Sequence, residues 1–210
     1  MRTTSSGVVG VLAVLTLALA LPTFADGTLA IEAEVGKSTY CSLSKDEVDV
    51  WVTLVIRYRS NLEQPLILCH RNDVAGYELF RDTEHLGANR PLRKFASKVL
   101  SMFDASKIDT SQQPHSGLFE VVQSGTVAKR PVTVNLVVRG PKVRPLPGGD
   151  YYLRVRVDPW PANRRSGEVL EDAWKSRGKL LTAPFTLPAV RVHIQEPPGV
   201  ESCLHVGRID

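Results

Sequence analysis

The feature that most constrains the fold is a strict apolar alternation in residues 47 to 59, EVDVWVTLVIRYR. Successive side chains of a β-strand point to opposite faces, so a period of two gathers every second residue on one face. Here that face is continuously apolar, and its members are Val48, Val50, Val52, Leu54, Ile56 and Tyr58. The other face carries Trp51, Thr53 and Val55 before it becomes charged, so we expect it to be covered along part of its length.

The same period recurs in residues 28–35, 130–140, 146–157 and 189–195. The inward positions of these runs are Leu29, Ile31, Ala33, Val35, Val132, Val134, Leu136, Val138, Tyr151, Leu153, Val155, Val157, Val190, Val192 and Ile194. Shorter extended runs follow at 65–71, 77–80 and 117–123, with turn residues at 61–65 and 72–76. About seven short strands without alternating helices predict a mainly β fold, an antiparallel two-sheet sandwich.

Helical spacing is confined to two places. Ser166 is a candidate N-cap for a short helix near 166–177, whose apolar stripe is Val169, Leu170, Ala173 and Trp174, and Gly178 is a candidate stop. Residues 91–103, PLRKFASKVLSMF, fit either a helix that begins at Pro91 or an irregular strand that crosses between sheets. These residues belong to a segment, 82–115, that we expect to be an irregular insertion.

Residues 1–25 have the pattern of a cleavable secretory signal. A positive start at Met1 and Arg2 precedes an uncharged run at 8–21, and Thr23 and Ala25 supply the small side chains of a cleavage site. The run is shorter than the ~20 residues of a membrane-spanning helix, so cleavage after Ala25 is favoured over an uncleaved anchor. We therefore expect a secreted or periplasmic protein, with one domain at 26–205, a tail at 206–210 and no membrane span after cleavage.

The three cysteines, Cys41, Cys69 and Cys203, predict one disulfide and one thiol in an exported protein. Cys69 lies in an apolar run, where a free cysteine packs as a small buried hydrophobe. Cys41 and Cys203 flank the domain, and the ends of a compact domain often lie close together. The sequence therefore predicts a Cys41–Cys203 bridge, the alternative being three reduced thiols.

A family resemblance adds to this reading. The run LPGGDYYLRVRV, a Trp-Pro pair, a short helix ending WKSRGKL and an apolar last strand together resemble a group of uncharacterised exported bacterial proteins with an immunoglobulin-like fold. The resemblance covers mainly 126–203 and, weakly, 47–70. It implies an immunoglobulin-like β-sandwich, whose strand F follows a tyrosine-containing corner similar to the Leu-Pro-Gly turn before Tyr151. It implies no catalytic residue.

No catalytic, cofactor or metal pattern is present in the sequence. The histidines, His70, His85, His115, His193 and His205, have no metal-ligand spacing, and the motifs GxSxG and HExxH and a glycine-rich phosphate loop are absent. Cys69 and His70 are neighbours on a strand and so point to opposite faces. We therefore expect a non-catalytic module without cofactor or metal, and an enzyme with an unrecognised site is the most distant alternative.

One arrangement suggests a binding face. If the strand at 149–157 neighbours the last strand, Tyr152, Arg154, Arg156, Arg191 and His193 share an outward, positive face. Such a face is suited to an acidic protein or an anionic polysaccharide, although a solvated strand face looks the same in sequence. The net charge of +4 comes from scattered basic residues, so no nucleic-acid partner is expected.

The tryptophans suggest a second binding mode. Trp174 lies on the apolar stripe of its helix, which favours core packing. Trp160 is flanked by prolines in a loop and is therefore the candidate for an exposed platform on which a glycan or another small ligand would stack.

Overall fold

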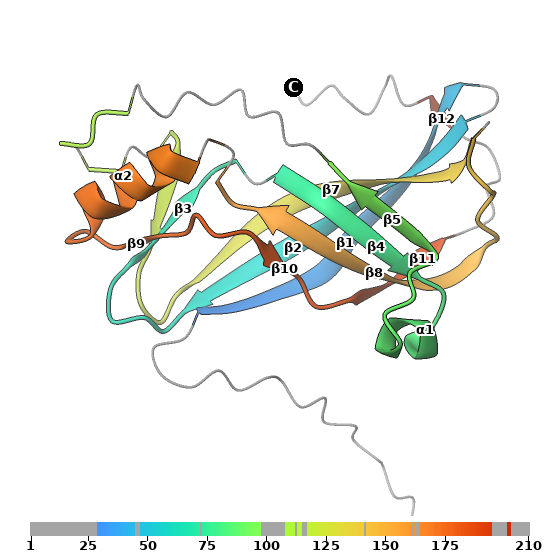
Figure 1. Ribbon diagram of the computed structural model, residues 1–210, viewed down its shortest axis with the longest axis horizontal. Coiled ribbons are helices and arrows are strands. Elements are labelled where there is room, and N and C mark those ends of the chain that lie inside the picture. Colours follow the sequence, from blue (N-terminus) through green and yellow to red (C-terminus); the bar gives the residue numbers. More distant parts are fainter. Residues whose placement is uncertain are drawn as a thin grey trace, which may run out of the picture.

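Extended chain dominates the computed structural model of the protein, as the alternation predicts (Figure 1). The structure describes residues 29–44, 47–71, 73–97, 108–111, 113–114, 117–140, 142–160, 162, 164–194 and 201–202. In chain order its elements are β1 (Leu29–Ser44), β2 (Glu47–Ser60), β3 (Leu66–Cys69), β4 (Asp73–Phe80), α1 (Thr83–Gly87), β5 (Arg93–Ala96), β6 (Phe119–Val122), β7 (Val127–Arg139), β8 (Gly149–Asp158), α2 (Arg164–Trp174), β9 (Lys179–Leu180), β10 (Phe185–Thr186), β11 (Val190–Ile194) and β12 (Glu201–Ser202).

These strands form three sheets. The first sheet has the order β12-β1-β2-β7, and the second has the order β10-β8-β4-β5 with β11 also paired to β8. The third sheet is small, with the order β6-β3-β9. Among the described strands, β1 pairs with β12 and β3 with β9 in parallel, and the other pairs are antiparallel. The mainly β, antiparallel character is thus confirmed.

The main core lies between the first and second sheets. Every predicted inward residue of β2 is buried, and so are those of β7 and β8. In one cluster, side chains of β2 and β7 from the first sheet meet side chains of β4, β8 and β11 from the second. Two facing layers of alternating strands therefore bury the apolar surface that stabilises the fold. Along β1 the alternation is less well covered, since Val35 is 37% exposed where the register with β2 shifts.

A second core lies between the third sheet and α2. Both faces of β3 are buried: Leu66 and Leu68 join the main core, whereas Ile67 and Cys69 join this second cluster. The remaining members of the second cluster are Phe119, Trp160, Leu170, Trp174 and Leu180. Figure 1 shows α2 at one end of the strands, beside β3 and β9, and α1 near the other end. The predicted helix and the core position of Trp174 are confirmed.

The details of α2 differ from the prediction. The helix begins at Arg164, so Ser166 lies inside it rather than at its N-cap. Its buried positions are Gly167, Leu170 and Trp174, whereas Val169 and Ala173 of the predicted apolar stripe are exposed.

The chain between β3 and β6 also departs from the prediction. The turn expected at 72–76 is wrong, because β4 begins at Asp73 and runs through Gly76. A Cβ at Gly76 would lie 2.5 Å from the carbonyl oxygen of Phe95, so the glycine permits close pairing with β5 rather than a turn.

Of the two alternatives for 91–103, a strand is observed at β5, and residues 98–107 lie outside the described ranges. The helix α1 was not predicted, and Asp82 caps its N-terminus by accepting the His85 N–H.

Several sequence predictions fall on residues that are not described. The predicted signal peptide, the C-terminal tail and Cys203 lie outside the described ranges. No disulfide is seen in the described part of the chain, where Cys69 is free and buried. Neither described helix has the length and apolar composition that crossing a membrane would require.

Candidate functional site

The predicted binding face lies on the outer side of the second sheet. Strand β11 pairs antiparallel with β8 and places Arg191 opposite Tyr152, so the expected neighbourhood of these strands is confirmed. Because Tyr151, Leu153, Val155 and Val157 point into the core, the alternate residues Tyr152, Arg154 and Arg156 point outward. The structure thus brings Tyr152, Arg154, Arg156, Arg191 and His193 together on one sheet face.

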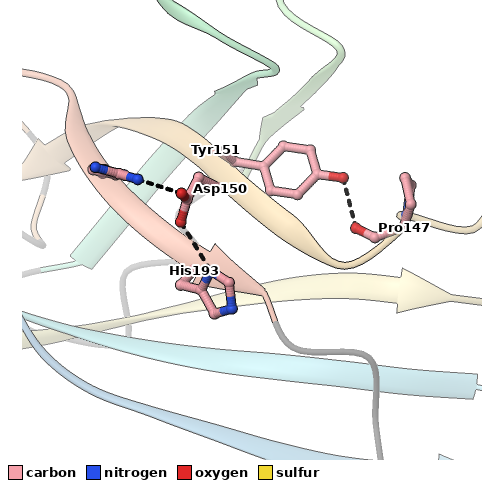
Figure 2. Close-up of polar contacts among 5 residues, drawn as sticks. Pro147, Asp150, Tyr151 and His193 are labelled. Atoms are coloured by element: carbon pink, nitrogen blue, oxygen red, sulfur yellow. Dashed lines mark hydrogen bonds and ion pairs between the residues drawn. The ribbon is translucent and has the colours of Figure 1, made fainter.

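At one end of this face the positive charge is neutralised. Asp150 accepts hydrogen bonds from an Arg191 guanidinium nitrogen and from His193 Nδ1, the latter at 2.8 Å (Figure 2). The hydrogen bond from Arg191, followed by that from His193, lowers the pKa of the Asp150 carboxyl. Sequence reasoning missed Asp150, although the same period of two places it beside Tyr152 on the outward face. Arg191 and His193 are therefore held by this carboxylate rather than displayed alone.

The middle of the face is partly neutralised. Arg154 Nη1 lies 3.2 Å from Glu78 Oε2 and 2.9 Å from Asn89 Oδ1, and its guanidinium carbon lies 4.7 Å from the centre of the Phe80 ring. The same Glu78 carboxylate also pairs with Lys94 Nζ at 2.9 Å. One negative charge thus serves two cations, and this part of the face keeps an excess of positive charge.

Arg156 extends that excess. It is exposed, and within the described ranges no carboxylate pairs with it. It borders a pocket of about 250 Å³ on the outer face of the second sheet, which Lys94, Glu78 and Arg154 also line. We call this the sheet-face pocket. Its lining carries three cationic side chains and one carboxylate. Gly76 and Thr186, the pairing partners of Arg156, also line it.

Trp160 occupies a different place from the one predicted. The exposed-platform prediction is wrong, because Trp160 is only 3% exposed and stacks on Phe119 with ring centres 6.4 Å apart. The Trp160 main-chain N–H donates to Asp158 Oδ1 at 3.1 Å, which folds the loop back toward the second core. Gly167 of α2 leaves room for the indole, since a Cβ there would lie 3.0 Å from Trp160 Nε1.

A cleft of about 680 Å³ opens beside the buried Trp160, between α2 and the second sheet. Its three acidic side chains already have partners. Glu168 pairs with Arg164 at 3.0 Å, Glu171 accepts from the Thr182 hydroxyl at 3.1 Å, and Asp158 accepts the Trp160 main-chain N–H. Arg156 lines this cleft as well as the sheet-face pocket.

Cys69 faces the second core. Burial is the main cause that raises the pKa of the Cys69 thiol, which keeps it protonated. His70, the next residue, is exposed.

No metal-binding group of three or more His, Cys, Asp or Glu side chains occurs in the part of the chain that the structure describes. The candidate site is the predicted binding face, because the pairing of β8 with β11 brings its residues together. No family model, no curated protein and no solved structure matches this chain.

Proposed function

We propose that the protein is an exported, non-catalytic binding module with an immunoglobulin-like β-sandwich, which docks an acidic protein or an anionic polysaccharide on the outer face of its second sheet. The observation that carries the proposal is the sheet-face pocket, where Lys94, Arg154 and Arg156 surround the single carboxylate of Glu78. The export signal in residues 1–25 supports a secreted or periplasmic location.

Two features support the immunoglobulin-like part of the proposal. Antiparallel sheets enclose a common core, as in sandwiches of this class. In addition, the Tyr151 hydroxyl donates to the Pro147 carbonyl oxygen, four residues earlier, at 2.7 Å (Figure 2). A tyrosine that closes a corner onto upstream backbone is a feature of immunoglobulin domains.

The electrostatics favour an anionic partner over a neutral one. An exposed guanidinium offers paired donors that match carboxylate, sulfate and phosphate oxygens. Arg156 has these donors available, and Arg154 is held in place by Glu78, Asn89 and the Phe80 ring. An arginine that is already ordered loses less conformational entropy when it binds. A polyanion would thus meet one fixed and one available guanidinium beside Lys94.

Chromatography on immobilised dextran sulfate tests this proposal. We expect the processed protein to stay bound at about 0.15 M salt, where exposed charges are already screened beyond ~8 Å. The double variant Lys94→Gln with Arg156→Gln should elute at clearly lower salt. The matched control is Arg165→Gln with Arg139→Gln, which removes two exposed cations from α2 and β7. No retention at low salt, or equal loss in both double variants, would contradict docking at this pocket.

The cleft beside Trp160 supports a second candidate, a glycan or small-ligand binder. It is large enough for a small organic ligand, since such sites enclose roughly 300 to 1,000 Å³. In this candidate Trp160 contributes a wall rather than a stacking platform, because its ring is buried. A glycan array with Glu171→Ala as the comparison tests it: binding that survives this substitution, or no binding to any glycan, would contradict the cleft as a site.

A further inference from the structure

A separate pocket of about 380 Å³ lies where the end of β4, the start of β5 and the loop before β8 meet. We call it the arginine pocket. Its lining residues are Arg81, Leu92, Arg93, Arg144, Pro145, Leu146, Pro147 and Tyr151. None of them belongs to the predicted binding face, and none lines the sheet-face pocket.

The charge of this pocket is one-sided. Arg81, Arg93 and Arg144 line it, and no lining side chain is a carboxylate. None of the three arginines forms an ion pair with a carboxylate in the described ranges. Like charges on neighbouring side chains repel one another, so a lining of this kind is more stable once an anion occupies it.

Arg93 is the fixed member of the set. It is half-buried, and its guanidinium donates to the carbonyl oxygens of Val137 in β7 and of Arg144 in the loop. Burial lowers the pKa of the Arg93 guanidinium, while the phenols of Tyr77 and Tyr151 act in the opposite direction. A guanidinium has five N–H donors, so these two carbonyls leave others available to a ligand.

Tyr151 also lines this pocket. Its hydroxyl donates to the Pro147 carbonyl oxygen at 2.7 Å and holds the loop in place (Figure 2). Burial raises the pKa of the Tyr151 phenol, while Arg81 and then Arg93 act in the opposite direction. Tyr151 and these two arginines thus line one pocket.

The rest of the lining is apolar. Leu92 is half exposed, Leu146 is buried, and Pro145 and Pro147 continue the wall between them. A pocket that combines a few charged donors with an apolar wall is typical of small-molecule sites. Three cations without a carboxylate partner in the described ranges call for more than one negative charge, which a single carboxylate does not supply and a phosphate monoester does.

We propose that the arginine pocket binds a small organic phosphate monoester, with the phosphate on Arg81, Arg93 and Arg144 and the organic part against Leu92 and Leu146. This inference is independent of docking at the sheet-face pocket, since the ligand is a small molecule and the residues differ.

Titration calorimetry of the processed protein with phenyl phosphate tests the proposal, with phenol and benzoate as the neutral and singly charged comparisons. We expect phenyl phosphate to bind, benzoate to bind more weakly and phenol not to bind. Arg81→Gln and Arg144→Gln should each weaken phenyl phosphate binding by about tenfold or more, as expected for the loss of one charge-assisted hydrogen bond. These exposed residues are preferred to Arg93, whose replacement also releases two carbonyl groups.

Arg165→Gln controls for net charge and should bind phenyl phosphate as the unmodified protein does. Lys94→Gln with Arg156→Gln should also leave this binding unchanged, which separates the two pockets. The proposal is overturned if phenyl phosphate does not bind at low salt, if phenol binds equally well, or if Arg81→Gln with Arg144→Gln has no effect. Loss of phenyl phosphate binding in the Lys94 and Arg156 double variant would also overturn it, since the anion would then occupy the sheet-face pocket.

Discussion

Tyr151 ties the loop before β8 to the strand itself. Its ring is buried in the main core, and its hydroxyl donates to Pro147. Tyr151→Phe removes that hydrogen bond and keeps the ring, so we expect the free energy of unfolding to fall by about 1 kcal/mol. Urea unfolding measures this as a lower midpoint with an unchanged slope. Tyr152→Phe, on the outward face, is the control, and an equal loss in both variants would contradict a specific role for the Tyr151 hydroxyl.

Asp150 should make the free energy of unfolding decrease as the pH falls into the acid range. Because the folded state lowers the pKa of its carboxyl through Arg191 and His193, the carboxylate favours folding above its ordinary pKa of about 4. That contribution is lost as the pH falls through the lowered pKa. Asp150→Asn should therefore unfold at a lower temperature than the unmodified protein at neutral pH, and the difference should vanish in strong acid. A difference in melting temperature that persisted in strong acid would contradict this assignment.

The connection from α2 to β9 depends on one glycine. Gly178 has φ +155°, and a Cβ there would lie 2.5 Å from the Pro65 carbonyl oxygen, which accepts the Lys179 N–H at 2.8 Å. Gly178→Ala should lower the free energy of unfolding by at least about 2 kcal/mol, because it combines backbone strain with a steric clash. Chemical denaturation measures the loss. In the control Gly87→Ala the added Cβ meets nothing within 4 Å, and a cost as large as that at Gly178 would refute the steric explanation.

How far the sequence predicts each element depends on what determines that element. The strands β2, β7 and β8 were predicted because their alternation directly reflects one buried face. By contrast, β5 and β9 are short and are defined by the strands they pair with, Leu180 for example lying opposite Ile67. Such pairing between distant segments leaves no periodic signal. For the same reason Gly76 was interpreted as a turn residue, whereas its role is to allow β5 to approach.

In the candidate site, too, features set by strand period were predicted and features set by contacts between segments were not. Strand period alone predicts that Arg154 and Arg156 share a face of β8. That Arg191 and His193 join this face depended on the expected pairing of the two strands, which the structure confirms. Their partners were not predicted: Glu78 comes from β4, whose position beside β8 only the sheet order reveals. The arginine pocket could not be predicted from the sequence, because its cations come from the end of one strand, the start of another and a loop. The prediction of an exposed Trp160 was wrong because flanking prolines indicate a loop but do not show whether the loop packs against the core. Here Trp160 packs into the second core.

At the scale of the whole molecule, β3 makes the two cores one cooperative unit. Leu68 packs in the main core and Ile67 in the second, so neither core can open without exposing part of the other. Trp160 and Trp174 both belong to the second core, so tryptophan fluorescence reports mainly on it, whereas circular dichroism reports on the sheets. We expect the two signals to give coincident urea transitions. A fluorescence transition at clearly lower urea than the dichroism transition would show that the second core unfolds alone.

Strand β12 lies beside β1, although the two strands are far apart in the sequence. Strand β12 pairs in parallel with β1, which places Cys41 opposite Glu201, two positions before Cys203 in the sequence. This register does not bring Cys203 opposite Cys41, and no disulfide is seen among the described residues, where Cys69 is only 1% exposed in the second core. The Cys41–Cys203 bridge therefore stays a prediction from the sequence.

A bridge that closes so long a loop stabilises the fold by about 5 kcal/mol in the chain-entropy account, and by less if it is strained. If the predicted bridge forms, peptide mapping of the protein without reductant should recover the Cys41 and Cys203 peptides joined and the Cys69 peptide free. Cys41→Ser with Cys203→Ser should lower the melting temperature, whereas the reductant-treated protein should match this double variant. A bridge containing Cys69 would contradict the predicted pairing of cysteines, and a melting temperature that reductant leaves unchanged would contradict a stabilising bridge.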